Sequence, residues 1–142
     1  MQKDKSRFAS LTLLKQNEHH YPQSPEEASL ETFKNLYADR DYIITFDCPE
    51  YTSLCPVTGQ PDFGHIVLRY IPDQLCVESK SLKLYLFSFR NTNTFHEEPE
   101  NTILDAGVKA CKPRAAEVVG EFRPRGGIAI HVTARYGEKI DG

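Results

Sequence analysis

The order in which hydrophobic repeats change period along this chain restricts its possible folds more than any other feature. Four segments alternate apolar and polar side chains: 42–47, 65–71, 116–123 and 128–135. Such alternation, with β-branched and aromatic residues, predicts strands. Between the two pairs, apolar residues recur at helical spacing over 82–89 and over 103–111, and Pro113 ends the second repeat. The sequence thus predicts two strands, two helices and two more strands.

The simplest fold for this order is an α+β domain in which two helices cover one face of a four-stranded antiparallel sheet. The 142 residues fit one domain spanning 1–142. Residues 1–25 are polar and predict a flexible N-terminal arm, and a short helix is expected over 26–37. One ambiguity remains in the middle, where Leu82, Leu84 and Leu86 also alternate, so that a strand is an alternative there.

Composition narrows the functional class. A net charge of −3 argues against a nucleic-acid-binding face. No apolar run approaches the roughly 20 residues that a membrane helix needs, and the N-terminus does not resemble a signal peptide. The chain is therefore expected to be cytoplasmic, where its four cysteines would be reduced. No C-x-x-C pair is present, so a structural zinc site has little support and no metal is expected.

One cysteine lies in a segment whose composition predicts function. The sequence from Cys48 to Asp62 is rich in turn-forming residues and predicts a loop of about 15 residues, a length that is usually functional or disordered. Two prolines favour a fixed relation between Cys55 and Asp62. A thiol nucleophile beside a carboxyl proton donor suits covalent catalysis. The alternative is a simple turn with a half-buried cysteine and a surface aspartate.

Two further segments have a functional and a structural interpretation. Lys80 and Lys83 share one face of the first predicted helix, after Ser79 as its expected N-cap, and suit the phosphates of a dinucleotide; the alternative is a solvated helix face. Thr94 to Glu97 matches a capping box, which alone would explain Glu97. A carboxylate there also suits the N–H donors of a guanine-like ring.

Together these segments resemble one enzyme family. Cys-Pro-Val-Thr-Gly-Gln-Pro-Asp-Phe at 55–63 is similar to the active-site loop of the NADPH-dependent 7-cyano-7-deazaguanine reductases. Glu-Ser-Lys-Ser-Leu-Lys-Leu-Tyr at 78–85 resembles the signature that separates them from the related GTP cyclohydrolases, and Phe-His-Glu at 95–97 resembles their substrate-binding element. The resemblance covers roughly residues 40–137 and implies the tunnelling fold (T-fold), with ring-forming homo-oligomers whose sites lie between subunits.

The resemblance also implies a reaction: reduction of the nitrile of 7-cyano-7-deazaguanine to an amine with two NADPH, in queuosine biosynthesis for tRNA modification. It assigns the nucleophile to Cys55 and the general acid to Asp62. It also implies substrate binding by Val77, Glu78, Ser79, His96 and Glu97. The expected cofactor binding by Lys80 and Lys83, which belong to the signature, and by Arg125, in a basic turn, rests on their charge.

Two rival hypotheses use the same residues differently. A zinc-dependent hydrolase similar to the GTP cyclohydrolases would recruit Cys55, His65 and Cys111, or a similar set, as ligands. A non-catalytic purine- or pterin-binding ring protein would leave Cys55 inert. Direct contact of this chain with nucleic acid or membrane is not expected.

Overall fold

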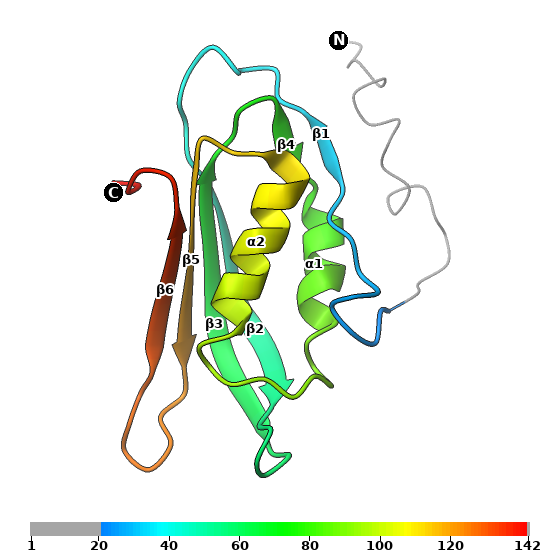
Figure 1. Cartoon of the computed structure of the whole chain (residues 1–142), viewed down its shortest axis with the longest axis vertical. Helices are drawn as coiled ribbons and strands as arrows, with labels where there is room; N and C mark the ends of the chain where they lie inside the picture. Colours follow the sequence, from blue (N-terminus) through cyan, green and yellow to red (C-terminus); the bar gives the residue numbers. More distant parts are fainter. Residues whose placement is uncertain (1–20, 142) are drawn as a thin grey trace.

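The computed structural model describes residues 21–141 and has the expected α+β architecture (Figure 1). The elements follow in the order β1 (Thr32–Lys34), β2 (Ile44–Leu54), β3 (Pro61–Ile71), β4 (Leu75–Val77), α1 (Ser79–Phe87), α2 (Pro99–Cys111), β5 (Ala115–Phe122) and β6 (His131–Tyr136). The two predicted helices and all four predicted long strands are confirmed. The expected N-terminal arm falls mostly on residues 1–20, which lie outside the described residues.

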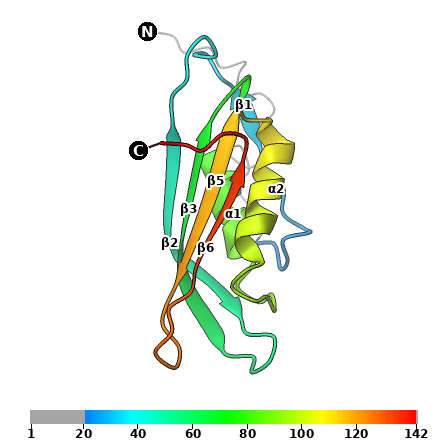
Figure 2. The ribbon, with the colours of Figure 1, turned by 60° about the vertical axis from the view of Figure 1, so that its left-hand side comes forward.

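The main sheet is antiparallel throughout, in the order β2-β3-β5-β6, and the short strands β1 and β4 form a separate pair. Both helices lie on one face of the main sheet, as the two views show (Figures 1 and 2). Inward side chains of β3 and β5 form the centre of the core, with Ile66, Tyr70 and Val118 almost completely buried. Burial of these alternate residues on one face fixes the register of the sheet.

The expected helix over 26–37 is wrong. After a short turn, in which the Glu27 N–H donates to the Ser24 carbonyl, the chain becomes extended, and Thr32–Lys34 pairs with Leu75–Val77. The prediction included neither strand of this short pair. A β-branched and an aromatic residue favour the extended form here, and a three-residue strand has too short a repeat to be recognised.

The predicted 15-residue loop is also wrong, because most of it belongs to a hairpin. β2 continues to Leu54 and β3 begins at Pro61, which leaves only residues 55–60 as a connection. A bulge between Cys48 and Tyr51 accommodates Pro49. Proline is tolerated at a bulge on an edge strand because no ladder donor is needed there.

Different elements of the fold lie at the two ends of the molecule. The β2–β3 and β5–β6 hairpin tips and the connection from α1 to α2 gather at one end, whereas β1, β4 and the start of α1 lie at the other (Figures 1 and 2).

Among the described residues, none of the helices is long and apolar enough to cross a membrane.

Within residues 21–141, the core contains one buried carboxyl group without a hydrogen-bond partner. Glu100, in the first turn of α2, is 0% exposed, and neither of its carboxyl oxygens has a hydrogen-bond partner. It packs against Gly120 of β5 so closely that a Cβ there would overlap Oε2 of Glu100. Burial is the main cause, and the charge of Glu97 adds to it: together they raise the pKa of Glu100 from 4.5 to about 7.

Candidate active site

Cys55 lies at the tip of the β2–β3 hairpin in a conformation that favours the thiolate. Its N–H donates to the Gln60 carbonyl at 2.8 Å, and its own carbonyl accepts from Gly59, which has a φ of 71°. Hydrogen bonds from the Thr58 hydroxyl, and from the backbone N–H groups of Thr58 and Val57, lower the pKa of the Cys55 thiol. A lowered pKa and partial exposure are the properties of a reactive cysteine.

The other cysteines have the opposite character. Burial raises the pKa of Cys111 to about 12, and burial beside Asp47 raises the pKa of Cys48. Cys76 is buried and lies 3.7 Å from the Tyr42 hydroxyl. None of the four is part of a disulfide among the described residues, and Cys55 alone combines partial exposure with a lowered pKa.

Asp62 is buried at the start of β3, with contacts on both of its carboxyl oxygens. Oδ1 lies 2.7 Å from Nη2 of Arg125, and Oδ2 lies 3.4 Å from Nε2 of His96. The His96 ring stacks on Phe122, with centroids 4.2 Å apart and planes at 3°. The structure therefore brings together three residues that were predicted separately, and it places Arg125 beside the predicted acid.

The segment that carries His96 is attached directly to the cysteine loop. The Leu54 N–H donates to the Thr92 carbonyl, and the Thr94 N–H donates to the Leu54 carbonyl, both at 3.0 Å. These two bonds form a short parallel bridge beside the residue that precedes Cys55. The connection between α1 and α2 is thus held against the hairpin tip, which explains why distant motifs meet here.

The capping-box interpretation of Glu97 is wrong, because the next residue has that role. The Glu98 carboxylate accepts from the Thr94 hydroxyl at 2.7 Å and from the Phe95 N–H at 3.0 Å. Glu97 is exposed, and within residues 21–141 no hydrogen bond or ion pair engages its carboxylate. Its side chain is thus available to a ligand. The two glutamates are adjacent in the sequence, and no pattern there distinguishes their roles.

The predicted substrate segment at 77–79 lies at the opposite end of the sheet. The Val77 N–H donates to the Tyr70 hydroxyl at 2.8 Å, and Tyr70 is eight positions beyond Asp62 on β3. A strand rises about 3.3 Å per residue, so roughly 26 Å of β3 separates the two groups. Within one chain, the structure does not bring residues 77–79 together with Asp62.

The expected N-cap Ser79 is replaced by Glu78. The buried Glu78 carboxylate accepts from the Lys80 N–H at 2.6 Å and from the Ser81 N–H at 2.7 Å. It therefore satisfies two donors at the start of α1. Ser79 itself is exposed at the beginning of the helix.

The two predicted cofactor lysines differ in environment. Lys83 is exposed and lines a groove of about 530 Å³ with Leu86, Phe87 and Arg90, opposite residues 48–52 of β2. Lys80 is half-buried one turn earlier. An apolar floor beside cationic side chains fits a dinucleotide, which combines flat rings with phosphates.

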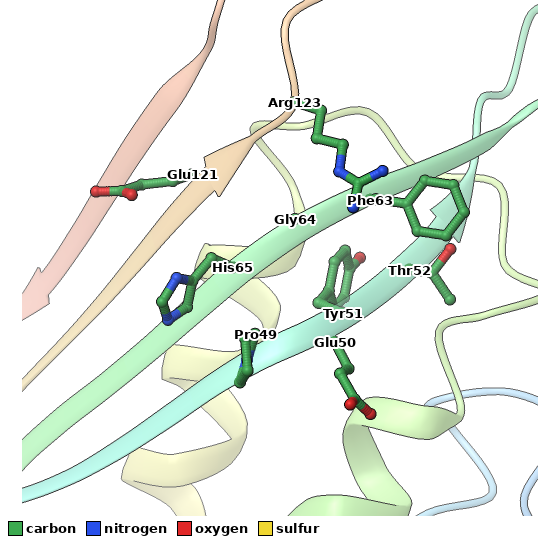
Figure 3. Close-up of a pocket in the computed structure, with 9 residues that line it drawn as sticks. All are labelled: Pro49, Glu50, Tyr51, Thr52, Phe63, Gly64, His65, Glu121 and Arg123. Atoms are coloured by element: carbon green, nitrogen blue, oxygen red, sulfur yellow. The ribbon is translucent and has the colours of Figure 1, made fainter.

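A second groove, of about 360 Å³, lies at the bulge in β2 (Figure 3). It contains none of the residues assigned to the reductase site, but His65, a candidate ligand of the zinc hypothesis, lines it. Phe63 and Arg123 line it together, with the Arg123 guanidinium 5.1 Å from the ring centroid. His65 projects into the same view and pairs with Asp47.

The ligand set of the zinc hypothesis does not converge. Cys55 is at the hairpin tip, His65 pairs with Asp47, and Cys111 is buried at the far end of α2. Within the described part of the chain, no group of three His, Cys, Asp or Glu residues is arranged to hold a metal ion.

Comparison with known proteins assigns the chain to a family. Residues 61–141, more than half of the chain, match the family of QueF-like proteins. The chain belongs to this family. An NADPH-dependent 7-cyano-7-deazaguanine reductase of Streptococcus thermophilus is 57% identical over 128 residues, which cover 90% of this chain and 78% of the relative. The enzyme of the same name from Neisseria gonorrhoeae is 50% identical over 138 residues, covering 97% and 88%.

A solved structure supports the fold of this QueF-like chain. The apo form of the archaeosine synthase QueF-Like superposes with a TM-score of 0.61 at 21% sequence identity, covering 70% of this chain and 96% of that one. At this identity the similarity concerns the fold alone, and it agrees with the T-fold expected from the sequence motifs.

Sequence reasoning missed two contacts in this QueF-like site. Thr58 was read only as part of a motif, although its hydroxyl is the main cause of the altered Cys55 acidity. Arg125 was assigned to the cofactor because it lies in a basic turn, and its proximity to Asp62 had no signal in the sequence. Contacts between hairpin tips 64 residues apart follow only from the folded sheet.

Proposed function

We propose that this protein reduces the nitrile of 7-cyano-7-deazaguanine to the aminomethyl group with two NADPH, as an enzyme of queuosine biosynthesis. Family membership supports the reaction. The observation that supports assigning the reaction to particular residues is the position of Cys55, with its lowered thiol pKa, on the same hairpin as the buried Asp62. No other cysteine in the chain combines accessibility with this acidity.

In the first step, the Cys55 sulfur adds to the nitrile carbon. A sulfur–carbon bond forms, one π bond of C≡N is replaced by N–H, and the thiol proton ends on the nitrogen. Asp62 carries this proton, since a buried carboxyl group on the same hairpin as the nucleophile is a suitable acid–base catalyst. The product is a covalent thioimide, whose C=N accepts a hydride more readily than an unactivated nitrile does.

Substrate recognition uses the exposed Glu97 carboxylate as acceptor for ring N–H donors, with His96 beside it. Bound NADPH supplies hydride for each of the two reductions. Lys80 and Lys83 would hold its phosphates along the groove beside α1, and Arg125 is a third candidate.

Val77, Glu78 and Ser79 contribute to substrate binding from a neighbouring subunit. The argument is geometric: about 26 Å of β3 separates this segment from Asp62 in one chain, too far for one small substrate to contact both. A homo-oligomer in which the start of α1 of one copy meets the hairpin tips of another completes the site. Among the described strands, nothing pairs with the outer edges of β2 and β6, and these edges are available for such assembly.

Intact mass and NADPH oxidation test the reaction. With the nitrile and no NADPH, the wild-type protein should gain one substrate mass, whereas Cys55→Ala should bind the nitrile and gain none. Asp62→Asn should form the adduct slowly or not at all. A folded, oligomeric wild type that neither forms the adduct nor oxidises NADPH with the nitrile would rule out the proposal.

Subunit complementation tests the shared site. Cys55→Ala and Ser79→Tyr should each be inactive, because one lacks the nucleophile and the other fills the substrate segment. Co-refolded mixtures should recover part of the wild-type rate, because some interfaces combine two intact halves. Mixtures that remain inactive, with mixed oligomers demonstrated, would place the whole site within one chain.

A further inference from the structure

The carboxyl group of Asp62 is engaged differently on its two oxygens. Its side chain is 6% exposed, so its charge must be compensated by protein groups. Oδ1 faces the Arg125 guanidinium at 2.7 Å, whereas Oδ2 faces His96 at 3.4 Å. An arginine cannot give up its proton in a protein, while histidine exchanges protons readily. The two sides of this carboxyl group are therefore chemically unequal.

The hairpin between β5 and β6 holds Arg125 in place. The Arg125 N–H donates to the Ile128 carbonyl, and the Ile128 N–H donates to the Arg125 carbonyl, both at 3.0 Å. The two residues between them, Gly126 and Gly127, have φ values of 58° and 80°. These are left-handed conformations that glycine adopts without strain. Nη2 of Arg125 also donates to the Pro61 carbonyl at 2.9 Å. A tight turn and a second anchor thus direct the guanidinium to the start of β3.

We propose that Arg125 is a positioning residue for Asp62, which occupies Oδ1 so that proton transfer at the active site passes through Oδ2. This inference rests on the proposed function. During addition of Cys55 to the nitrile, the proton that leaves sulfur passes by way of Oδ2 to the nitrile nitrogen. Arg125 neither gains nor loses a proton, and its contribution is to fix the orientation and balance the charge of the carboxyl group.

Adduct formation without NADPH separates this role from binding of cofactor phosphates. Arg125→Met should slow formation of the Cys55 adduct by about tenfold to a hundredfold, the loss typical of a misplaced catalytic group. Arg125→Lys should retain part of the rate. The matched control is Arg123→Met on the same hairpin, whose guanidinium lies over Phe63, and it should form the adduct at the wild-type rate.

Chemical rescue and a double variant exclude a simple folding defect. Methylguanidinium should restore adduct formation in Arg125→Ala but not in Asp62→Asn, and Asp62→Asn/Arg125→Met should be no slower than Asp62→Asn. An Arg125→Met protein that forms the adduct at the wild-type rate, with only the KM for NADPH raised, would overturn the positioning role and leave the proposed function intact. A wild type that forms no adduct would overturn both.

Discussion

The buried Glu100 makes the stability of this protein depend on pH in an unusual direction. Its pKa of about 7 in the folded state lies 2.5 units above the ordinary value of 4.5. Each unit corresponds to about 1.4 kcal/mol, so ionisation of this group costs the folded state about 3 kcal/mol. Below pH 4.5 the carboxyl is neutral in both states and the cost is absent. Between pH 4.5 and 7 only the unfolded state loses the proton, so stability falls as pH rises.

Glu100→Gln removes this ionisation while keeping the size of the side chain. The variant should match the wild type near pH 4.5 and exceed its free energy of unfolding by up to about 3 kcal/mol at pH 8. Urea denaturation at both pH values, at one protein concentration, measures the difference. Glu138→Gln, at an exposed position, is the matched control and should follow the wild type. Equal pH dependence of the wild type and Glu100→Gln would refute the reasoning.

Three further predictions concern the site and its support. Thr58→Val removes the main hydrogen bond that lowers the pKa of Cys55, so the pH midpoint of Cys55 alkylation by iodoacetamide should move upward; an unchanged midpoint would contradict this. Glu97→Gln should weaken nitrile binding by about 2–5 kcal/mol with little effect on the melting temperature. Its neighbour control, Glu98→Ala, loses two local hydrogen bonds and should lower the free energy of unfolding by about 1–3 kcal/mol. Normal nitrile binding by Glu97→Gln would show that Glu97 does not recognise the substrate. Gly120→Ala should lower the free energy of unfolding by about 1–3 kcal/mol, because its Cβ would overlap the buried carboxyl group; wild-type stability in urea would show that the carboxyl can move aside.

The main architecture could be predicted because the long elements bury one regular face. Alternation at Ile66, Leu68 and Tyr70 marks β3 in the sequence, and all three residues are buried in the core. The short strand β1 could not be predicted, since its three residues are stabilised by pairing with β4, a tertiary contact. The proline that suggested a loop at position 49 is accommodated by a bulge.

The proximity of candidate site residues was predictable where a motif lies within one hairpin. Cys55 and Asp62 belong to one hairpin, so their sequence spacing already implied proximity. The partner of Asp62 on the other hairpin depends on the pairing of β3 with β5, and the choice between Glu97 and Glu98 depends on the direction of a single turn. Neither the contact of Asp62 with the other hairpin nor the choice between these glutamates is marked by a repeat or a composition in the sequence.

The pairing of β3 with β5 also sets an order of events during folding. Both helices lie between these strands in the chain, so their first contact must close a long loop at a substantial entropic cost. The loop is shortest where Ile71 pairs with Ala115, and the ladder then extends toward Gly64 and Phe122. We expect the contact between Asp62 and Arg125, just beyond that far end, to form among the last. Pulsed hydrogen exchange during refolding would detect earlier protection of the Arg114 N–H, which donates to the Ile71 carbonyl, than of the Arg123 N–H, which donates to the Phe63 carbonyl. The proposed proton-transfer arrangement would then exist only in chains that have finished folding.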